Sequence, residues 1–295
     1  MKNDLQWKYP EAIIECDWLG KNIGNQKIRV YDCTTYLHYT DDHPLKPYDV
    51  ESGLADYEKA HIPKAAFLDL QNDLSDKTSP YRFTLPNFYE LAESFKRLGI
   101  GDPYHIILYS RNGMQWATRV WWMLYALGYE NVSVLNGGYV EWERLCLPIE
   151  SSPNRFDPAN FKVGIKSNVF VGKDRVLEAI GDQATLLLNA LTEDIHLGTN
   201  PRYGRLGRIP NSLNIPFHDL LEPSTGKFRP PEKAIQIFAE KGITSELEIV
   251  NYCGGGIAAS LDAFILRQLG FQRLQIYDNS MSEWAMDEEL PIETG

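Results

Sequence analysis

The two halves of this chain repeat one another, and this repeat limits the fold more than any other feature of the sequence. Leu147–Ser151 reads Leu-Pro-Ile-Glu-Ser, and 143 residues later Leu290–Thr294 reads Leu-Pro-Ile-Glu-Thr. At the same spacing, Ser110 and Cys253 each follow an apolar run that ends in tyrosine. Further matched pairs in the same order are Glu141-Trp142 with Glu283-Trp284 and Ile62-Pro63 with Ile209-Pro210. The offset is far longer than the ~20–50 residues of a solenoid repeat, so the sequence predicts two tandem domains of one fold.

Each half alternates apolar strands with helices. In the first half the pattern predicts strands at Ile28–Tyr31, His105–Tyr109 and Val132–Leu135, and helices at Phe88–Leu98 and Trp116–Leu127. In the second half it predicts strands at Ala184–Leu188, Leu247–Tyr252 and Leu274–Tyr277, and helices at Glu232–Lys241 and Ile257–Leu269. This alternation indicates an α/β fold in which each domain is a mostly parallel sheet flanked by helices. Ligands are then expected at the carboxyl ends of the strands.

The two domains are expected to join where the apolar periodicity is lost. Residues 151–160 are rich in proline, serine and asparagine, as linkers between domains are. The predicted division is therefore a first domain over 1–150, a linker over 151–160 and a second domain over 161–295.

Composition and charge narrow the range of partners. The net charge of −11 argues against nucleic acid and against an anionic membrane surface. No apolar run has the length of a membrane helix, and the first ten residues lack the apolar core of a signal peptide. The four cysteines show neither a Cys-x-x-Cys pair nor zinc-site spacing, and their density is too low for a disulfide scaffold. We therefore expect a cytoplasmic protein with no metal and no organic cofactor.

Cys253 stands at a junction that favours reactivity. The apolar run Ile249–Tyr252 ends at this cysteine, the three glycines 254–256 follow, and a helical pattern begins at Ile257. Consecutive glycines let backbone N–H groups converge on one point, and a helix N-terminus adds partial positive charge there. A thiol at such a place reacts as the thiolate. The alternative is a buried structural cysteine beside a turn, since free cysteine is among the most buried residue types.

Three chemistries use a thiolate that is held by backbone amides. A cysteine phosphatase needs an arginine six residues after the nucleophile to clamp the phosphoryl oxygens, and here that residue is Ala259. No cysteine protease signature surrounds Cys253. In sulfur transfer, the thiolate takes a sulfane sulfur from a donor, becomes a persulfide, and passes the outer sulfur to a thiol or cyanide. Because amide N–H groups stabilise an anionic persulfide without a side-chain base, this loop fits sulfur transfer best.

The first half carries a different residue at the matching position. Ser110 replaces the cysteine, and the loop Arg111–Gln115 that follows it contains one glycine instead of three. A serine there would need a neighbouring base to act as a nucleophile. We therefore expect the first domain to be the non-catalytic copy and to help wall the site of the second.

The sequence as a whole resembles the two-domain rhodaneses, the thiosulfate and 3-mercaptopyruvate sulfurtransferases. Besides the duplication and the Cys253 loop, the motifs that carry the resemblance are His61-Ile62-Pro63, Ser75–Tyr81 with Leu85-Pro86, Arg119–Met123, Val134–Gly138 and Tyr277–Trp284. The resemblance covers essentially the whole chain and implies two tandem rhodanese-like domains. It also implies a small-molecule sulfur donor and a persulfide on Cys253, in a site between the domains. The loop expected to bind that persulfide contains Gly254, Gly255, Gly256, Ile257 and Ala258.

Departures from the family pattern bear on the donor. Thiosulfate-type loops begin Cys-Arg-Lys-Gly, whereas mercaptopyruvate-type loops begin Cys-Gly-Ser-Gly or Cys-Gly-Thr-Gly. Gly254 therefore favours the mercaptopyruvate type, but Gly255 lacks the hydroxyl of that type, and Ala258 stands where threonine is usual. Thiosulfate, 3-mercaptopyruvate and a non-standard donor stay open on this basis.

The cations expected around the donor also differ from the family. Arg202 sits where the family has an arginine for the substrate carboxylate, while the second arginine is replaced by His196 or Ile195. Arg205 and Arg208 are nearby cations that could substitute. Arg208 itself takes the place of the usual histidine before Ile-Pro, and Asn189 that of the usual aspartate, which the first domain keeps as Asp32.

His61 is read either as a wall residue of the substrate site or as a structural histidine that satisfies its hydrogen bonds in a loop. For the whole chain, the alternative to an enzyme is a rhodanese-fold module that carries sulfur for a partner or has a regulatory role. Retention of Cys253 among three glycines favours catalysis, because a purely structural copy would not need that entropically costly turn.

Overall fold

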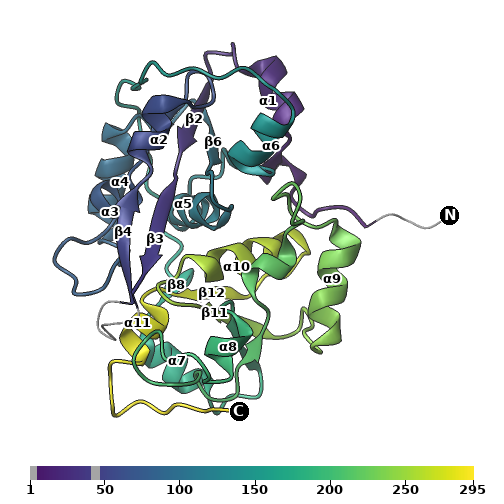
Figure 1. Ribbon diagram of the computed structural model, residues 1–295. Helices are drawn as coiled ribbons and strands as arrows, with labels where there is room; N and C mark the ends of the chain where they lie inside the picture. The colour runs from purple at the N-terminus through teal and green to yellow at the C-terminus, as the bar shows by residue number, and fades with distance from the viewer. Residues whose placement is uncertain (1–4, 41–46) are drawn as a thin grey trace.

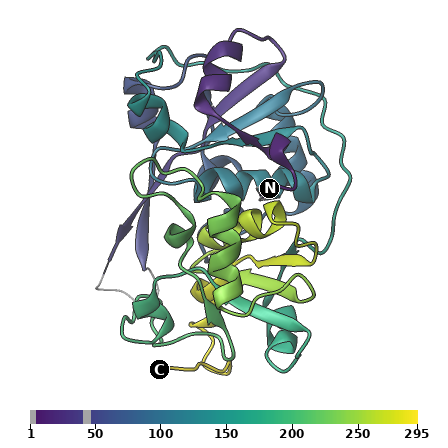
Figure 2. The same ribbon diagram turned by 90° about the vertical axis from the view of Figure 1, so that its right-hand side faces the viewer.

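The computed structural model describes residues 5–40 and 47–295. It contains two five-stranded sheets, one in each half of the chain, and every pair of neighbouring strands within them is parallel. Figure 1 shows the first half above the second, and Figure 2 shows the same stacking from the side. The predicted α/β fold with two parallel, helix-flanked sheets is confirmed. Among the described residues, no helix is both long and apolar enough to cross a membrane.

The first sheet has the strand order β1-β7-β6-β2-β5. Its strands are β1 (Ile13–Ile14), β2 (Ile28–Asp32), β5 (Ala66–Phe67), β6 (His105–Tyr109) and β7 (Val132–Leu135). The surrounding helices are η1 (Pro10–Ala12), α1 (Cys16–Asn22), α2 (Leu54–Lys59), α3 (Leu70–Asp73), α4 (Phe88–Arg97), α5 (Gln115–Ala126) and α6 (Gly138–Arg144).

The second sheet has the matching order β10-β9-β11-β12-β8. Its strands are β8 (Phe170–Val171), β9 (Thr185–Asn189), β10 (Leu213–Asn214), β11 (Glu248–Tyr252) and β12 (Leu274–Tyr277). Its helices are α7 (Lys173–Ala179), α8 (Glu193–His196), η2 (Phe217–Leu220), α9 (Pro231–Glu240), α10 (Ala258–Gln268) and α11 (Ser280–Trp284). In both halves the central strands are covered on two faces, which is why they read as continuous apolar runs: every residue of β7 and β12 is buried.

Every strand and helix predicted from the sequence is present. The short strands β1, β5, β8 and β10 and the short helices of four to seven residues were not predicted. Strands β6, β7 and β12 have the predicted bounds, and the other predicted strands and helices differ by one or two residues at their ends. Also absent from the predicted set is an antiparallel hairpin formed by β3 (Thr35–Tyr39) and β4 (Tyr48–Ser52). Its strands are half exposed and lack the apolar run that marks a buried strand. Figure 1 shows this hairpin extending from the first half towards α11 of the second.

The repeat seen in the sequence is also a repeat of individual side-chain contacts. The indole N–H of Trp142 donates to the carbonyl oxygen of Pro148 over 2.8 Å. In the second half, Trp284 donates to Pro291 over the same distance. These bonds close the end of each domain in the same way, so the duplication extends to the anchoring of each unit's last turn.

A second repeated contact explains the residue before each Ile-Pro pair. His61 forms an antiparallel bridge with Glu150, and Arg208 forms the matching bridge with Glu293. Arg208 also forms an ion pair with the Glu293 carboxylate. The two positions are therefore structural equivalents, as the sequence alignment of the halves predicts.

Helices α5 and α10, which are equivalent in the repeat, pack against each other at the centre of the molecule (Figure 1). The hydroxyls of Thr118 and Ser260 are 2.8 Å apart, and the Trp122 indole donates to the Ser260 carbonyl over 2.9 Å. Trp121 meets Phe264 edge to face, with ring centroids 5.0 Å apart. This buried contact joins the two halves into one core.

Arg119 of α5 crosses this interface. Its side chain is fully buried and forms an ion pair with Asp278, which follows β12. The same guanidinium donates to the carbonyl oxygen of Phe83 over 2.9 Å. The other Asp278 oxygen accepts the Leu85 N–H over 2.7 Å. One charge pair thus ties a helix and a loop of the first half to the end of the second sheet.

Replacing Asp278 with alanine tests this tie. The variant leaves the Arg119 charge buried without its counter-ion, so we expect stability to fall by about 3–5 kcal/mol. Urea unfolding measures the loss. The matched control is Glu93→Ala, which removes an exposed pair with Lys96 and should change stability by roughly 1 kcal/mol or less. An Asp278→Ala variant as stable as the wild type would show that the pair does not hold the halves together.

Candidate active site at Cys253

Cys253 lies between the end of β11 and the start of α10, in the strand–loop–helix arrangement that the sequence predicts. The residue is 2% exposed. Its backbone N–H donates to the Ser280 hydroxyl over 3.1 Å, and its carbonyl oxygen accepts the Met281 N–H over 3.0 Å. These bonds fix the backbone of the cysteine from the α11 side.

The loop after Cys253 offers a run of free amide donors. In the described part of the chain, the N–H groups of residues 254–258 donate no backbone or side-chain hydrogen bond. They lie at the N-terminal end of α10, where the helix dipole also favours negative charge. Gly256 has φ +71°, and a Cβ there would lie 2.6 Å from the Asp278 carbonyl oxygen. Only glycine allows this close approach.

Two tyrosines approach the loop where Gly254 and Gly255 have no side chains. A Cβ on Gly254 would lie 1.9 Å from the Tyr203 hydroxyl oxygen, so that oxygen occupies the space a side chain would need. A Cβ on Gly255 would lie 3.2 Å from the hydroxyl oxygen of Tyr48. Tyr48 comes from β4 of the first half and Tyr203 from the loop before β10. The site is therefore assembled from both halves of the chain.

Both phenols stay protonated at neutral pH. Burial, reinforced by the neighbouring Tyr48 and Cys253, raises the pKa of Tyr203 well above its usual range. Burial likewise raises the pKa of Tyr48, although a hydrogen bond with the Ser282 side chain acts in the opposite direction. Two neutral hydroxyl groups thus lie beside the cysteine loop.

Arg202, one of the predicted binding residues, directly precedes Tyr203 in the chain. Its guanidinium stacks over the Tyr39 ring at 3.8 Å from the centroid. Burial raises the pKa of the Tyr39 phenol. The Arg202 charge acts to lower this pKa, and Cys253 acts to raise it further. No carboxylate in the described part of the chain lies within ion-pair distance of Arg202, so its charge is available to an anionic ligand. Arg82 of the first half lies on the same side, with its carbonyl oxygen 3.6 Å from the Cβ position on Gly255.

Arg205 and Arg208 are engaged elsewhere. Arg205 donates to the carbonyl oxygens of Asp287 and Leu290, at 2.7 and 2.9 Å. Arg208 pairs with Glu293 and donates to the Gly295 carbonyl oxygen over 2.7 Å. Both guanidinium groups brace the C-terminal segment, and their contacts do not bring them to the cysteine loop.

His61 also stays within the first half. It is fully buried, stacks on Tyr57 at 4.0 Å between ring centroids, and contacts the Tyr57 carbonyl oxygen through Nδ1 at 2.6 Å. Its Nε2 lies 3.6 Å from a Glu150 oxygen. These contacts favour the structural reading of His61 over the substrate-wall reading.

His196 does not replace the second family arginine as a cation. It is 8% exposed, and its Nδ1 lies 3.2 Å from the amide nitrogen of Asn189. Burial, together with the nearby Arg208 charge, lowers the pKa of His196 to about 4. The imidazole is therefore neutral at neutral pH.

The matching loop of the first half is filled by its own side chains. The Ser110 hydroxyl donates to the Gly113 carbonyl oxygen. The Arg111 guanidinium stacks on Tyr139 at 3.6 Å and lies 3.6 Å from the buried Asp32 carboxylate. No reactive group takes the place of Cys253 there, which agrees with a non-catalytic first copy.

The remaining cysteines differ from Cys253 in their surroundings. Burial, reinforced by Glu141, raises the pKa of Cys16 to about 12, and burial raises that of Cys33 well above the usual range. Cys146 is exposed on the surface. Neither Cys16 nor Cys33 therefore forms a thiolate at neutral pH.

Among the described residues, no group of three or more His, Cys, Asp and Glu side chains could hold a metal ion.

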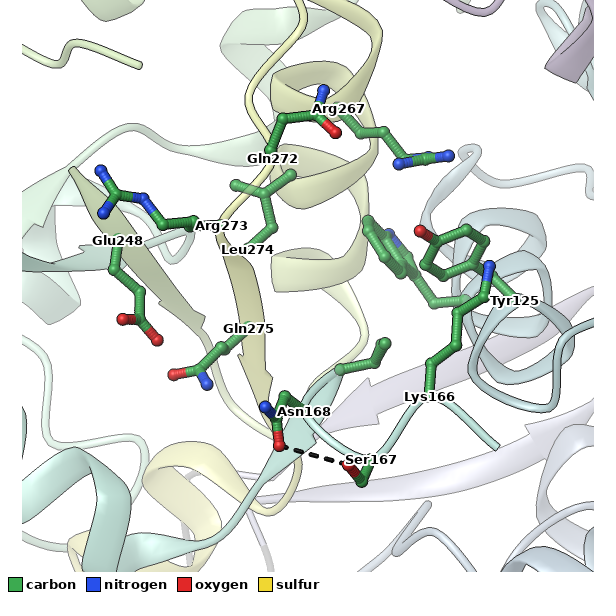
Figure 3. Close-up of a pocket in the computed structure, with 12 residues that line it drawn as sticks. Tyr125, Lys166, Ser167, Asn168, Glu248, Arg267, Gln272, Arg273, Leu274 and Gln275 are labelled. Carbon is green, nitrogen blue, oxygen red and sulfur yellow. Dashed lines mark hydrogen bonds between the residues drawn. The ribbon is translucent and has the colours of Figure 1, made fainter. Parts of the chain in front are cut away.

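A separate cavity of about 470 Å³ lies at the other end of the second sheet (Figure 3). Tyr125, Lys166, Arg267 and Gln275 are among its lining residues, and Figure 3 shows their side chains around it. Neither Cys253 nor any other predicted site residue lines it. The cavity is therefore distinct from the cysteine loop.

Replacing Gly254 with alanine tests the fit between the loop and Tyr203. The new Cβ collides with the phenol oxygen, so we expect a stability loss of about 1–3 kcal/mol and a changed rate of Cys253 reaction with a soluble disulfide reagent. Urea unfolding and absorbance measure the two effects. Gly24→Ala is the control, because a Cβ there meets nothing within 4 Å. Equal behaviour of the two variants would contradict the described packing.

The buried His196 predicts an acid-sensitive fold. Because its pKa is lowered to about 4 in the folded protein, from 6.5 in the free side chain, the unfolded chain binds its proton first as pH falls. Stability from this group is complete above pH 6.5 and is lost between pH 6.5 and about 4, by on the order of 3 kcal/mol. Urea unfolding across this range should show a smaller loss in His196→Gln. Parallel curves for the two proteins would contradict the prediction.

Comparison with known proteins gives the chain's relatives. The model of the rhodanese-like domain matches twice, over residues 15–145 and 175–287. Rat thiosulfate sulfurtransferase is 30% identical over 283 residues, which cover 92% of this chain and 91% of that protein. Mouse 3-mercaptopyruvate sulfurtransferase is 31% identical over 287 residues, which cover 93% of this chain and 92% of that protein.

Solved structures agree with this assignment. The crystal structure of Escherichia coli SseA, described with the rhodanese fold, superposes with a TM-score of 0.77 at 26% identity and covers 91% of this chain and 98% of that one. An anaerobic ergothioneine biosynthesis enzyme from Chlorobium limicola shares the fold, with a TM-score of 0.81 at 21% identity over 98% of this chain and 71% of that one. The chain therefore belongs to the rhodanese family, as a tandem member with two rhodanese-like domains.

Proposed function

We propose that this protein is a sulfurtransferase that forms a persulfide on Cys253. The thiolate attacks the transferable sulfur of a small donor, either the outer sulfur of thiosulfate or the thiol sulfur of 3-mercaptopyruvate. The outer sulfur of the resulting persulfide then passes to a thiol or cyanide. The observation that carries the proposal is the run of unpaired amide donors at residues 254–258 beside the thiol. Such donors stabilise an anionic sulfur at the point where it forms.

The donor that fits this loop best is 3-mercaptopyruvate. Thiosulfate-type members carry an arginine directly after the cysteine, but the Tyr203 hydroxyl occupies the position of a Gly254 side chain. Arg202 is the cation available for the donor's carboxylate, and its stack on Tyr39 holds it at the mouth of the site. Electrostatic binding of an anionic donor therefore falls to the rim and to the loop amides.

Replacing Cys253 with serine tests the nucleophile. Thiocyanate formation from cyanide is measured with thiosulfate and with 3-mercaptopyruvate in parallel. We expect the wild-type rate to be higher with 3-mercaptopyruvate. In Cys253→Ser the rate with either donor should fall by roughly 10³-fold or more, because no thiolate remains to accept the sulfur.

Cys146→Ser is the matched control, since it removes the exposed thiol and should leave turnover unchanged. Turnover in Cys253→Ser equal to that of the wild type would exclude Cys253 as the nucleophile. A wild-type protein that gains a persulfide from a donor but releases no thiocyanate would instead point to a sulfur-carrying module.

A further inference from the structure

The hydroxyl group of Tyr203 lies directly beside the cysteine loop. The residue is 5% exposed, and its oxygen fills the space beside Gly254, next to the sulfur-bearing residue. Within residues 5–40 and 47–295, this hydroxyl forms no hydrogen bond with another residue. A phenol can donate its proton to a group that binds beside it. The position of the Tyr203 hydroxyl next to Gly254 points to a group bound at the Cys253 sulfur.

Two other hydroxyl groups around the loop, those of Ser280 and Tyr48, already have partners. Ser280 accepts the Cys253 N–H and donates to the Tyr277 carbonyl oxygen over 2.7 Å. The Tyr48 hydroxyl is hydrogen-bonded to Ser282. Gly255 supplies no hydroxyl at all. Of Ser280, Tyr48 and Tyr203, Tyr203 is the one whose hydroxyl forms no hydrogen bond with the residues that the structure describes.

The two donors of the proposed function differ in their need for a proton. When thiosulfate gives up its outer sulfur, the leaving group is sulfite, a stable anion that takes up no proton in this step. When 3-mercaptopyruvate gives up its sulfur, the leaving group is the enolate of pyruvate. This enolate is a strong base, and its methylene carbon must be protonated. A protonated group next to the broken C–S bond speeds only the second reaction.

We propose that Tyr203 is the catalytic acid that protonates the enolate leaving group when 3-mercaptopyruvate is the donor. This inference rests on the proposed function and assigns the group that replaces the hydroxyl missing at Gly255. The phenol carries its proton at neutral pH because burial raises its pKa, and the enolate carbon is a strong enough base to take that proton. Tyr203 belongs to the loop before β10 and not to the cysteine loop. The amides of residues 254–258 therefore stay free to bind the sulfur.

The step balances without a further reactant. The Cys253 thiolate attacks the donor sulfur, the S–S bond forms, and the C–S bond breaks with its electron pair on the methylene carbon. The two sulfurs together lose the two electrons that this carbon gains. Tyr203 protonates the carbon to give pyruvate, and the phenolate then takes the proton of the new S–SH group. The products are pyruvate, the persulfide anion and the restored phenol.

Tyr203→Phe keeps the ring and removes the proton, and the two donors provide the comparison. We expect kcat with 3-mercaptopyruvate to fall by about 10²–10⁴-fold, the usual contribution of a general acid. The rate with thiosulfate should stay within roughly twofold of the wild type, which also shows that the variant folds. Stopped-flow kinetics of persulfide formation, with intact mass spectrometry of Cys253, separates this step from transfer to the acceptor.

Tyr252→Phe is the matched control, since it removes another buried phenol whose hydroxyl contacts Ser212 at 2.9 Å. It should affect both donors alike. Equal losses with both donors in Tyr203→Phe, or no loss, would overturn the inference and leave the proposed function standing. So would a wild type that uses thiosulfate alone. A wild type that forms no persulfide with either donor would overturn the proposed function as well.

Discussion

The buried ion pair between Arg119 and Asp278 is the interaction on which the site depends. Arg119 has no access to water, and a buried charge is tolerated only when its partners are complete. Its guanidinium reaches Asp278, the Phe83 carbonyl oxygen and, at 3.5 Å, the Gly256 carbonyl oxygen. The same group that joins the halves therefore also contacts the cysteine loop. Any movement of one half relative to the other would change the setting of the loop, which makes the interface part of the site.

This arrangement explains what the first half contributes after losing its own nucleophile. Its former pocket is closed by Arg111 against Asp32 and Tyr139. Its hairpin, in contrast, extends across the interface and brings Tyr48 to the loop of the second half and Tyr39 to Arg202. The loop of the first half is thus filled by its own side chains, while its hairpin packs against the cysteine loop of the second half.

The parts predicted from the sequence are those with a local cause. Apolar runs gave the strands, and three consecutive glycines marked the loop at Cys253, because both patterns reflect constraints within a few residues. Tyr48 and Tyr203 were missed as site residues. Tyr48 contacts a glycine about 200 positions away and Tyr203 one about 50 positions away. From its sequence neighbours alone, such a tyrosine cannot be distinguished from a residue of the hydrophobic core. Arg205 was named for its position near a motif, but its carbonyl partners depend on the path of the C-terminal segment, which no pattern reveals.

Under the proposed function, the donor that the protein uses depends on how the Tyr203 phenol packs against the glycine loop that follows Cys253. In this structure, a side chain directly after the cysteine would need the space that the Tyr203 hydroxyl occupies. With the phenol in place, the loop holds charge only through its amides, and attraction for an anion moves outward to Arg202. In the sulfur transfer proposed for this site, the amides and the neutral phenol would stabilise the charge that develops during the reaction rather than the charge of the free donor. Under the proposed mechanism, selectivity follows from the leaving group, because a donor that needs a proton gains from Tyr203 and one that needs none does not.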